Sequence, residues 1–222
     1  MYLLSKSYTT PQDNLDCDEQ LLQQVNNGTL TQGVLRIWES PSYFVVLGLS
    51  KKADVDVHEA QCKQDNIPIL KRCSGGGTVL QGPGCFNYGF ILPMSFHADL
   101  ASLHNTTTYI LHTVQRILEP KVPDCALMGI SDLAINHVKF SGNAQRRLKH
   151  AILFHGTILY NMDLGLVSKY LKEPPVQPDY RNKRPHQRFI QNLPITRTEC
   201  EGLFTNAHTA LGLNMPMEGL GV

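Results

Sequence analysis

Apolar residues recur along the chain at two spacings, one typical of helices and the other typical of strands. Apolar positions three and four residues apart predict amphipathic helices, and short runs of alternating or β-branched residues predict strands. The predicted helices cover residues 16–25, 55–65, 103–118 and 163–171, with a last helix from Thr196 or Thr198 to about Leu211. The predicted strands cover residues 34–38, 44–49, 67–70, 78–80, 86–92, 133–135, 138–141 and 151–159.

The connections between these elements help to predict the fold class. The strands 34–38 and 44–49 are separated only by a short polar segment, and we expect them to form a hairpin. Pro120 ends the longest helical pattern, because proline cannot continue a helix. Strands often follow strands directly. The pattern therefore predicts an α+β fold, with a mixed, largely antiparallel sheet and flanking helices, rather than a doubly wound sheet.

Composition and charge narrow the class of protein. The chain has 222 residues, of which 42% are hydrophobic, enough for one globular domain with a proper core. Its net charge is only +1, so no overall basic field indicates nucleic acid as a partner. The N-terminus lacks the features of a signal peptide, and no apolar run approaches the roughly 18 residues of a membrane span. These features predict a cytoplasmic protein.

The six cysteines do not predict a metal site or a disulfide framework. They stand at positions 17, 62, 73, 85, 125 and 200, without CxxC pairs and without the Cys/His spacing of zinc sites. A chain of this length does not need disulfides for stability. We expect reduced thiols and no protein-built metal centre.

A glycine-rich segment is the first candidate for chemistry. Residues 71–79 read Lys-Arg-Cys-Ser-Gly-Gly-Gly-Thr-Val. Consecutive glycines let backbone N–H groups approach an anion closely, and Arg72 offers a forked donor for phosphate or carboxylate. The segment is not a Walker A loop, because the Gly-Lys-Ser/Thr ending is absent. On these residues alone, a flexible hairpin turn is an equally good interpretation.

A lysine and a histidine on predicted strands are further candidates. Lys139 lies between apolar neighbours, where a partly desolvated ammonium is costly unless an anion meets it. The alternative is an edge-strand lysine in water. His155 lies in an apolar strand, where a lone histidine is usually a satisfied structural residue. Gly156 in a strand interior indicates close approach by a ligand or by another backbone segment.

These segments together resemble the lipoate–protein ligase A / octanoyltransferase family, which is related to the biotin–protein ligases. Five segments match in the family's order over nearly the whole chain: the opening helix with Asp18-Glu19, the Leu35–Gly48 stretch, the Ile67–Val79 loop, Gly129–Leu133 with Lys139–Gln145, and His155–Leu159. The Leu35–Gly48 stretch looks like the family's first hairpin. Biotin is a less favoured substrate, because the loop is closer to the lipoate form.

The resemblance implies a fold, a reaction and a set of residues. Residues 1–195 would form a catalytic domain like the biotin ligase core, and residues 196–222 a helical extension of it without a separate accessory domain. The family's ligases join lipoate or octanoate to AMP, using ATP and Mg²⁺, and then transfer the acyl group to a lysine of a lipoyl carrier domain. Lys139 would be the catalytic residue. The residues implied to bind substrate or nucleotide are Arg72, Ser74, Gly75, Gly76, Gly77, Thr78, Asn87, Asp132, Ser141, Gly142, Ala144, His155, Gly156 and Thr157. Trp38, Val79 and Phe140 would line the acyl slot.

The implied partners are lipoyl-bearing proteins. They are the lipoyl domain of a 2-oxoacid dehydrogenase E2 subunit or the glycine cleavage H protein, with acyl carrier protein or a separate accessory-domain chain as further candidates. The basic segment 180–188 would dock an acidic carrier domain or cover phosphates, and a solvated basic loop is the simpler interpretation.

Two departures from the family pattern keep alternatives open. Where the ligases usually have His-Asp-x-Gly-Asn, this chain has Gln81-Gly-Pro-Gly-Cys85, and Asn87 is the expected substitute for the missing polar groups. Cys125 lies close to the position of a thioester nucleophile in the family's transferases, and a thiolate near Lys139 and Arg72 would have a lowered pKa. The alternatives are therefore an octanoyl or lipoyl transferase that uses Cys125 without ATP, and a non-catalytic acyl- or nucleotide-binding subunit.

Overall fold

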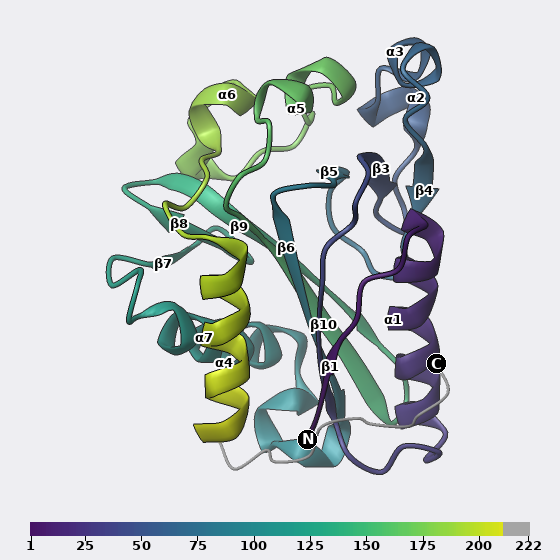
Figure 1. Ribbon diagram of the computed structural model, residues 1–222, viewed down its shortest axis with the longest axis vertical. Coiled ribbons are helices and arrows are strands. Elements are labelled where there is room, and N and C mark those ends of the chain that lie inside the picture. The colour runs from purple at the N-terminus through teal and green to yellow at the C-terminus, as the bar shows by residue number, and fades with distance from the viewer. Residues whose placement is uncertain (211–222) are drawn as a thin grey trace.

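The computed structural model describes residues 1–210 and places ten strands and seven α-helices in that range (Figure 1). The strands are β1 (Tyr2–Ser5), β2 (Val34–Trp38), β3 (Phe44–Leu47), β4 (Ile69–Lys71), β5 (Val79–Gln81), β6 (Cys85–Pro93), β7 (Ala126–Met128), β8 (Asp132–Ile135), β9 (Val138–Arg147) and β10 (Ala151–Leu159). The helices are α1 (Pro11–Asn26), α2 (Ala53–Asp56), α3 (Glu59–Gln64), α4 (Leu103–Leu118), α5 (Gly165–Tyr170), α6 (His186–Phe189) and α7 (Arg197–Ala210).

Two sheets organise the domain. The larger has seven strands in the order β1-β2-β6-β10-β9-β8-β7, and only the β1–β2 pair is parallel. The smaller has the order β4-β3-β5, with β3 parallel to β4 and antiparallel to β5. The predicted α+β class with a mixed, largely antiparallel sheet is confirmed.

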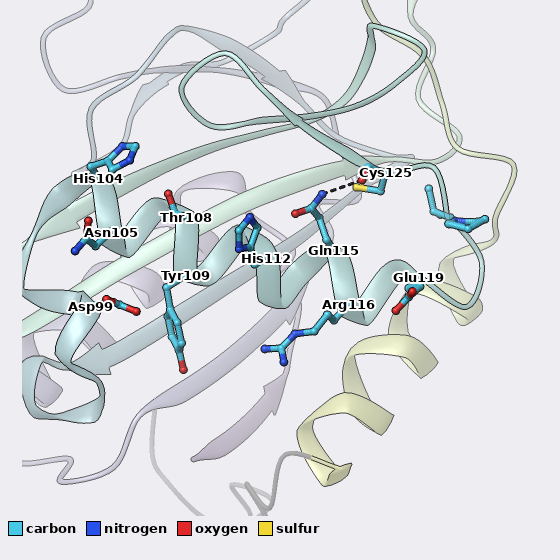
Figure 2. Close-up of a pocket in the computed structure, with 12 residues that line it drawn as sticks. Asp99, His104, Asn105, Thr108, Tyr109, His112, Gln115, Arg116, Glu119 and Cys125 are labelled. Carbon is cyan, nitrogen blue, oxygen red and sulfur yellow. Dashed lines mark hydrogen bonds between the residues drawn. The ribbon is translucent and has the colours of Figure 1, made fainter.

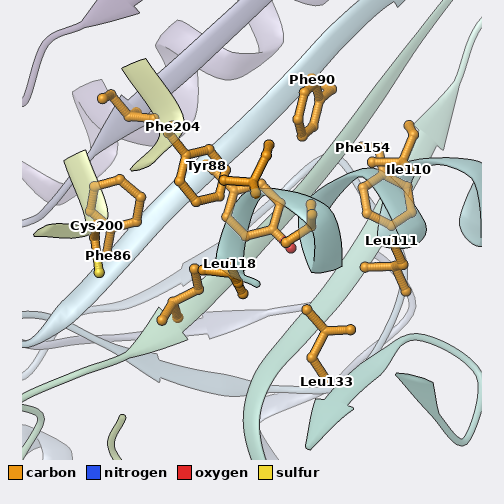
Figure 3. Packing of buried hydrophobic residues seen from close by; sticks show 14 of the residues in the cluster. Phe86, Tyr88, Phe90, Ile110, Leu111, Leu118, Leu133, Phe154, Cys200 and Phe204 are labelled. Carbon is orange, nitrogen blue, oxygen red and sulfur yellow. The ribbon is translucent and has the colours of Figure 1, made fainter. Parts of the chain in front are cut away.

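The large sheet is covered on both faces (Figure 1). Helices α4 and α7 pack on one face, where aromatic side chains of β6 and β10 meet aliphatic residues of α4 and Phe204 of α7 (Figure 3). The rings of Tyr88 and Phe204 have centroids 5.0 Å apart in this core. Helix α1 packs on the other face against β2, β6 and β10. The small sheet lies beyond one end of α1 (Figure 1).

Polar residues start the long helices. The Thr10 hydroxyl accepts a hydrogen bond from the Asp13 N–H at 3.2 Å, and Pro11 follows at the first helical turn of α1. At α7, the Thr196 hydroxyl accepts from the Glu199 N–H at 3.2 Å, and the Glu199 carboxylate accepts from the Thr196 N–H at 2.9 Å. This reciprocal capping box satisfies helix-end donors that would otherwise be unpaired. Thr196, one of the two proposed starts, therefore caps the helix.

Several predicted elements differ from the structure. The predicted hairpin of residues 34–38 and 44–49 is wrong, because β2 joins the large sheet and β3 joins the small one. The single helix predicted for residues 55–65 is two short helices, α2 and α3, separated where Val57 forms a bridge to Leu171. Strands β1 and β7 were not predicted. The predicted end of the last helix, Leu211, and the rest of the proposed extension to residue 222 lie outside the described residues.

Two expectations about the whole chain can be compared with the structure. All six cysteines are free thiols, which agrees with the absence of a disulfide framework. None of the helices in residues 1–210 has the length and apolar composition of a bilayer-crossing segment.

Candidate functional site

The gap between the two sheets contains a cavity of about 1010 Å³. Its walls come from β5, β6, β9, β10 and α1, from the glycine loop after β4, and from the segment 172–190. Thirteen of the residues expected to bind ligand or act in catalysis line it: Arg72, Gly76, Gly77, Thr78, Asn87, Asp132, Lys139, Ser141, Gly142, Ala144, His155, Gly156 and Thr157. Ser74 and Gly75 do not line this cavity, and Cys125 lines a different one. Three segments far apart in sequence thus converge on one cavity.

Arg72 holds the glycine loop in place. Its Nε donates to the Ser74 hydroxyl at 2.9 Å, and its Nη2 donates to the carbonyl oxygens of Gly75 and Gly77 at 2.7 and 2.8 Å. Burial lowers the pKa of Arg72 to about 10, so the guanidinium stays charged at neutral pH. Because these bonds use Nε and both Nη2 hydrogens, Nη1 is the part of the group left for a ligand. The sequence predicted that the Arg72 guanidinium would be free to bind an anion with two N–H donors, but part of the group already binds the glycine loop.

A chain of hydrogen bonds connects the loop to the core. The Ser74 hydroxyl accepts a hydrogen bond from the Arg72 Nε–H and forms a second hydrogen bond with His155 Nε2 at 2.6 Å. The other ring nitrogen of His155, Nδ1, lies 3.5 Å from the Asp18 carboxylate. Asp18 also accepts from the buried Arg36. Both nitrogens of His155 have partners, as expected of a satisfied structural histidine, and its ring also borders the cavity.

The charge of Asp18 depends on its two partners. Burial raises the pKa of this carboxyl group, but the Arg36 guanidinium and the contact with His155 lower it more, and the net pKa lies below the ordinary 3.8. Asp18 is therefore ionised at neutral pH and accepts from both partners. Sequence reasoning placed Asp18 only on the opening helix and did not identify its role behind the glycine loop.

Lys139 projects over Gly142 toward the cavity. Its Nζ pairs with Asp132 Oδ1 at 2.7 Å, and the Tyr180 hydroxyl donates to Asp132 Oδ2 at 2.7 Å. The lysine side chain is 24% exposed, so it is neither a free surface group nor fully buried. A Cβ atom at position 142 would lie 2.8 Å from Nζ, and glycine there leaves the ammonium its place. The alternative of an edge-strand lysine in open water is therefore wrong.

The loop that carries Asp132 is held by Asn143. The Asn143 side chain donates to the Ser131 carbonyl oxygen at 2.8 Å, and the Ser131 hydroxyl donates to the Asn143 carbonyl oxygen at 2.8 Å. The Tyr88 hydroxyl donates to the other end of the Asn143 amide, across Gly156. The close approach at Gly156 is thus made by two side chains rather than by another backbone segment. Neither Tyr88 nor Asn143 was identified from the sequence, because their contact depends on the pairing of β6, β10 and β9.

The stretch 81–85, which departs from the family pattern, forms a tight turn. A Cβ atom at Gly82 would lie 2.3 Å from the Tyr43 ring, and one at Gly84 would lie 2.1 Å from the Asn161 backbone. An aspartate therefore does not fit at position 82. Cys85 is fully buried, and burial raises its pKa to about 12. Of this stretch, only Gln81 lines the cavity.

Apolar residues line another part of the cavity. Trp38, Val46 and Val79 pack together with Leu15 of α1, and all four border the cavity. The predicted contributions of Trp38 and Val79 to an apolar slot agree with this arrangement. Phe140, the third residue expected there, also borders the cavity, although its side chain is fully buried in the main core.

Cys125 lies at a different depression, of about 880 Å³, on the exposed side of α4 (Figure 2). The Gln115 side chain donates to the Cys125 carbonyl oxygen at 2.8 Å. Burial raises the pKa of the Cys125 thiol to about 11. The expected lowering of this pKa by Lys139 and Arg72 is therefore wrong, since both cations line the other cavity.

The basic segment 180–188 is tied to the fold. The Arg181 guanidinium pairs with Glu173 and lies 4.6 Å from the centre of the Phe189 ring. Arg184 donates to the His137 carbonyl oxygen at 2.6 Å. The segment forms part of the cavity rim, through Arg181 and His186, whereas Lys183 and Arg188 are exposed. The interpretation as a solvated basic loop therefore holds for only part of the segment.

Comparison with known proteins agrees with this geometry. A family model described as the lipoyl protein ligase A/B catalytic domain matches residues 10–195. The probable lipoate-protein ligase A of Mycoplasma genitalium is 28% identical over 170 residues, which are 77% of this chain and 49% of that relative. The chain spans about half the length of the curated relatives it matches.

Solved structures share the fold. A lipoate-protein ligase A crystallised with ATP superposes with a TM-score of 0.81 at 18% identity, over 98% of this chain and 89% of that one. A bipartite lipoate protein ligase from Thermoplasma acidophilum, studied with its E2 lipoyl domain, superposes with a TM-score of 0.76 at 18% identity, over 98% and 87% of the two chains. The chain belongs to the lipoyl protein ligase A/B catalytic domain family.

Proposed function

We propose that this chain activates lipoate or octanoate as an acyl adenylate and transfers the acyl group to a lysine of a lipoyl carrier domain. One observation carries the proposal: Lys139, Arg72 and the glycine loop meet at a cavity that also has an apolar part. An anionic head and an apolar tail are the two features of a medium-chain acyl substrate.

The first step joins two anions and needs fixed positive charge. A carboxylate oxygen of the acyl substrate attacks the α-phosphorus of ATP, the bond to the bridging oxygen breaks, and pyrophosphate leaves with the electron pair. Lys139 Nζ and Arg72 Nη1 would offset the negative charge that gathers on the phosphorus oxygens. Backbone N–H groups of Gly76 and Gly77, which line the same cavity, would add neutral donors.

The carboxylates of the cavity suit a magnesium nucleotide. Mg²⁺ is usually held by one or two carboxylates together with substrate phosphates. Asp132 lies 2.7 Å from Lys139 Nζ, and Asp56 also lines the cavity, where it accepts from the Thr78 hydroxyl at 2.6 Å. Asp132 would contact the metal next to the phosphates, and the ion would supply charge compensation there. A structurally similar lipoate-protein ligase A was crystallised with ATP, and this supports the proposal of a nucleotide here.

The second step releases AMP. The neutral amine of the carrier lysine attacks the acyl carbonyl carbon, the bond from that carbon to the phosphate oxygen breaks, and the nitrogen loses a proton as the amide forms. An enclosed cavity limits competing attack by water. The lipoyl domain of an E2 subunit is the proposed partner, supported by the bipartite Thermoplasma ligase that was studied with its E2 domain. The glycine cleavage H protein and a separate accessory-domain chain are further proposed partners.

The thioester route has less support. It requires an ionised thiol beside the acyl head, whereas Cys125 lines the α4 depression with a raised pKa. A non-catalytic binder would not need the Lys139–Asp132–Tyr180 arrangement at the cavity. We therefore favour the ATP-dependent ligase.

The test combines two acyl donors with two lysine variants. The protein is incubated with an apo lipoyl domain and either lipoate with Mg-ATP or octanoyl carrier protein, and the domain is weighed by mass spectrometry. A mass gain that requires ATP supports the ligase. Lys139→Ala should lower the rate by about 10²-fold or more, because a charge at the transition state is lost. Lys149→Ala, a matched change at an exposed turn between β9 and β10, should leave the rate unchanged.

Three outcomes would contradict the proposal. A mass gain from octanoyl carrier protein without ATP would identify a transferase. Retained acyl or nucleotide binding without any mass gain would identify a binder. Near-normal turnover of Lys139→Ala would overturn the assignment of the site.

A further inference from the structure

A row of hydrogen-bonded side chains crosses the wall of the main cavity. The Asn87 amide nitrogen donates to the Cys85 carbonyl oxygen at 3.2 Å, and the Thr157 hydroxyl donates to Asn87 Oδ1 at 2.6 Å. The Gln81 amide nitrogen donates to the Thr157 hydroxyl at 2.5 Å. The row therefore connects β5 of the small sheet to β6 and β10 of the large sheet.

The direction of this row determines how the Gln81 amide is oriented. A backbone carbonyl can only accept, so the nitrogen of Asn87 faces Cys85 and its oxygen faces Thr157. Thr157 must then donate to Asn87, which leaves its oxygen to accept from the nitrogen of Gln81. Gln81 Oε1 consequently ends the row without a partner among the described residues, although the residue is only 7% exposed. Buried acceptors without a partner are rare in folded proteins, and each requires an explanation.

Gln81 is connected through Thr157 to the strand that carries Lys139. Thr157, whose hydroxyl accepts the hydrogen bond from the Gln81 amide, pairs with Gly142 of β9. Lys139 Nζ lies directly over Gly142. An acceptor at this place points to a ligand that brings an N–H or O–H donor close to the activated phosphate.

The chemistry of the proposed substrates limits where that donor can be. Lipoate and octanoate consist of a carboxylate and an apolar tail, and neither has a donor at neutral pH. Phosphate oxygens accept only. The remaining donors are the 6-amino group and the ribose hydroxyls of ATP, and the amine of the incoming carrier lysine.

The surroundings of Gln81 favour the nucleoside. Beyond Thr157 on the same strand lies Leu159, and Met162 and Val167 border the cavity beside it. This apolar surface suits the faces of a purine ring, whereas a lysine needs to reach only the acyl carbonyl. Gln81 is also the one member of the altered stretch 81–85 that lines the cavity.

We infer that Gln81 is a specificity-determining residue whose Oε1 accepts a hydrogen bond from the nucleoside of ATP and of the acyl adenylate. The inference rests on the proposed ligase function and assigns a role to the stretch in which this chain departs from its family. A site that pairs a buried acceptor with a substrate donor rejects analogues that lack the donor, because the acceptor is then left unpaired.

The experiment measures adenylation alone, as exchange of labelled pyrophosphate into nucleotide in the presence of lipoate or octanoate. The full chain is assayed with ATP and with three analogues: purine riboside triphosphate, which lacks the 6-amino group, 2′-deoxy-ATP and 3′-deoxy-ATP. We expect the wild type to prefer ATP to at least one analogue by about tenfold or more in kcat/KM, the effect of about one hydrogen bond. Gln81→Leu should reduce that same preference to about twofold or less. The analogue affected identifies the donor.

A matched variant and the wild type keep the test decisive. Gln115→Leu makes the same chemical change on α4, outside the main cavity, and should keep the wild-type preference. A wild type that uses all three analogues within about twofold of ATP would overturn the inference without any variant. It would also be overturned if a folded Gln81→Leu kept the preference, or if it lost only transfer to the carrier lysine. No exchange in the wild type would overturn the proposed function itself, and this inference with it.

Discussion

Replacing Gly156 by alanine tests whether the contact across β10 holds the Asp132 loop. A Cβ atom at this position would lie 1.8 Å from Asn143 Oδ1 and 2.6 Å from the Tyr88 hydroxyl oxygen. Both distances are far below van der Waals contact, so the two side chains must separate. Their hydrogen bond would then be lost within a closely packed region.

The magnitude follows from two costs. Forcing an additional methyl group into a packed interior costs about 1–3 kcal/mol. Leaving the buried Tyr88 hydroxyl and the half-buried Asn143 amide imperfectly paired costs about 1–3 kcal/mol more. The sum, about 2–6 kcal/mol, is a large part of the free energy of unfolding of a typical domain, about 5–15 kcal/mol. At about 2–4 °C per kcal/mol for a chain of this size, Tm should fall by about 4–24 °C.

The assay is thermal or urea unfolding of the variant beside a matched control. Gly202→Ala makes the same substitution in α7, where a Cβ atom meets no atom within 4 Å. Alanine is the better helix former, so this control should keep its Tm or raise it slightly. A Gly156→Ala protein that melts within about 2 °C of the wild type would refute the reasoning. Acyl transfer by the folded variant should also be slower, because Asn143 positions Ser131 and hence Asp132.

Three further predictions concern the buried polar groups and Cys125. Asp18→Asn should lower the free energy of unfolding by about 3–5 kcal/mol in urea titrations, because the buried Arg36 keeps its hydrogen bonds to Asn14 but loses its only charged partner among the described residues. A loss under about 1 kcal/mol would contradict the buried pair. Burial raises the pKa of Asp18, but its partners hold the net value below 3.8. The stabilising contribution of its carboxylate is therefore complete above about pH 4 and is lost as the pH falls through the folded pKa. Acid unfolding monitored by circular dichroism should accordingly be less pH-dependent in Asp18→Asn. Ser74→Ala should cost about 1–3 kcal/mol, since it removes the hydroxyl between Arg72 and its histidine partner, and an unchanged urea midpoint would count against that hydrogen-bond chain. Cys125→Ala should keep acyl transfer within about twofold, measured by mass spectrometry of the lipoyl domain, whereas a hundredfold loss would restore the thioester hypothesis.

Local pattern determined the type of many elements. The spacing of apolar residues in 103–118 predicted α4 with its observed bounds, because a helix with one buried face leaves that spacing in the sequence. Proline at 120 and threonine at 196 marked helix ends for reasons that act within a few residues. Alternation and β-branched residues likewise predicted β2, β6 and β10.

The sequence also identified residues able to bind a ligand or take part in a reaction, but it did not show which residues they contact. Lys139, Arg72 and the glycine run were candidates because a partly desolvated cation and a side-chain-free backbone are unusual in any fold. Their convergence on one cavity depended on how the small sheet, which carries Arg72 and the glycine run, packs against the large sheet, which carries Lys139. The resemblance to a family supplied that expectation, whereas periodicity alone did not.

The pairing of strands, and everything that depends on it, was decided only by the tertiary structure. Residues 34–38 and 44–49 read as a hairpin, yet β2 and β3 belong to different sheets, because burial against distant segments outweighs proximity in the chain. The contact of Tyr88 with Asn143 and the unpaired oxygen of Gln81 arise from the same long-range pairings. The predicted lowering of the Cys125 pKa was wrong for a similar reason. A pKa depends on burial and on charges within a few ångströms in space, and spacing along the sequence does not give those distances.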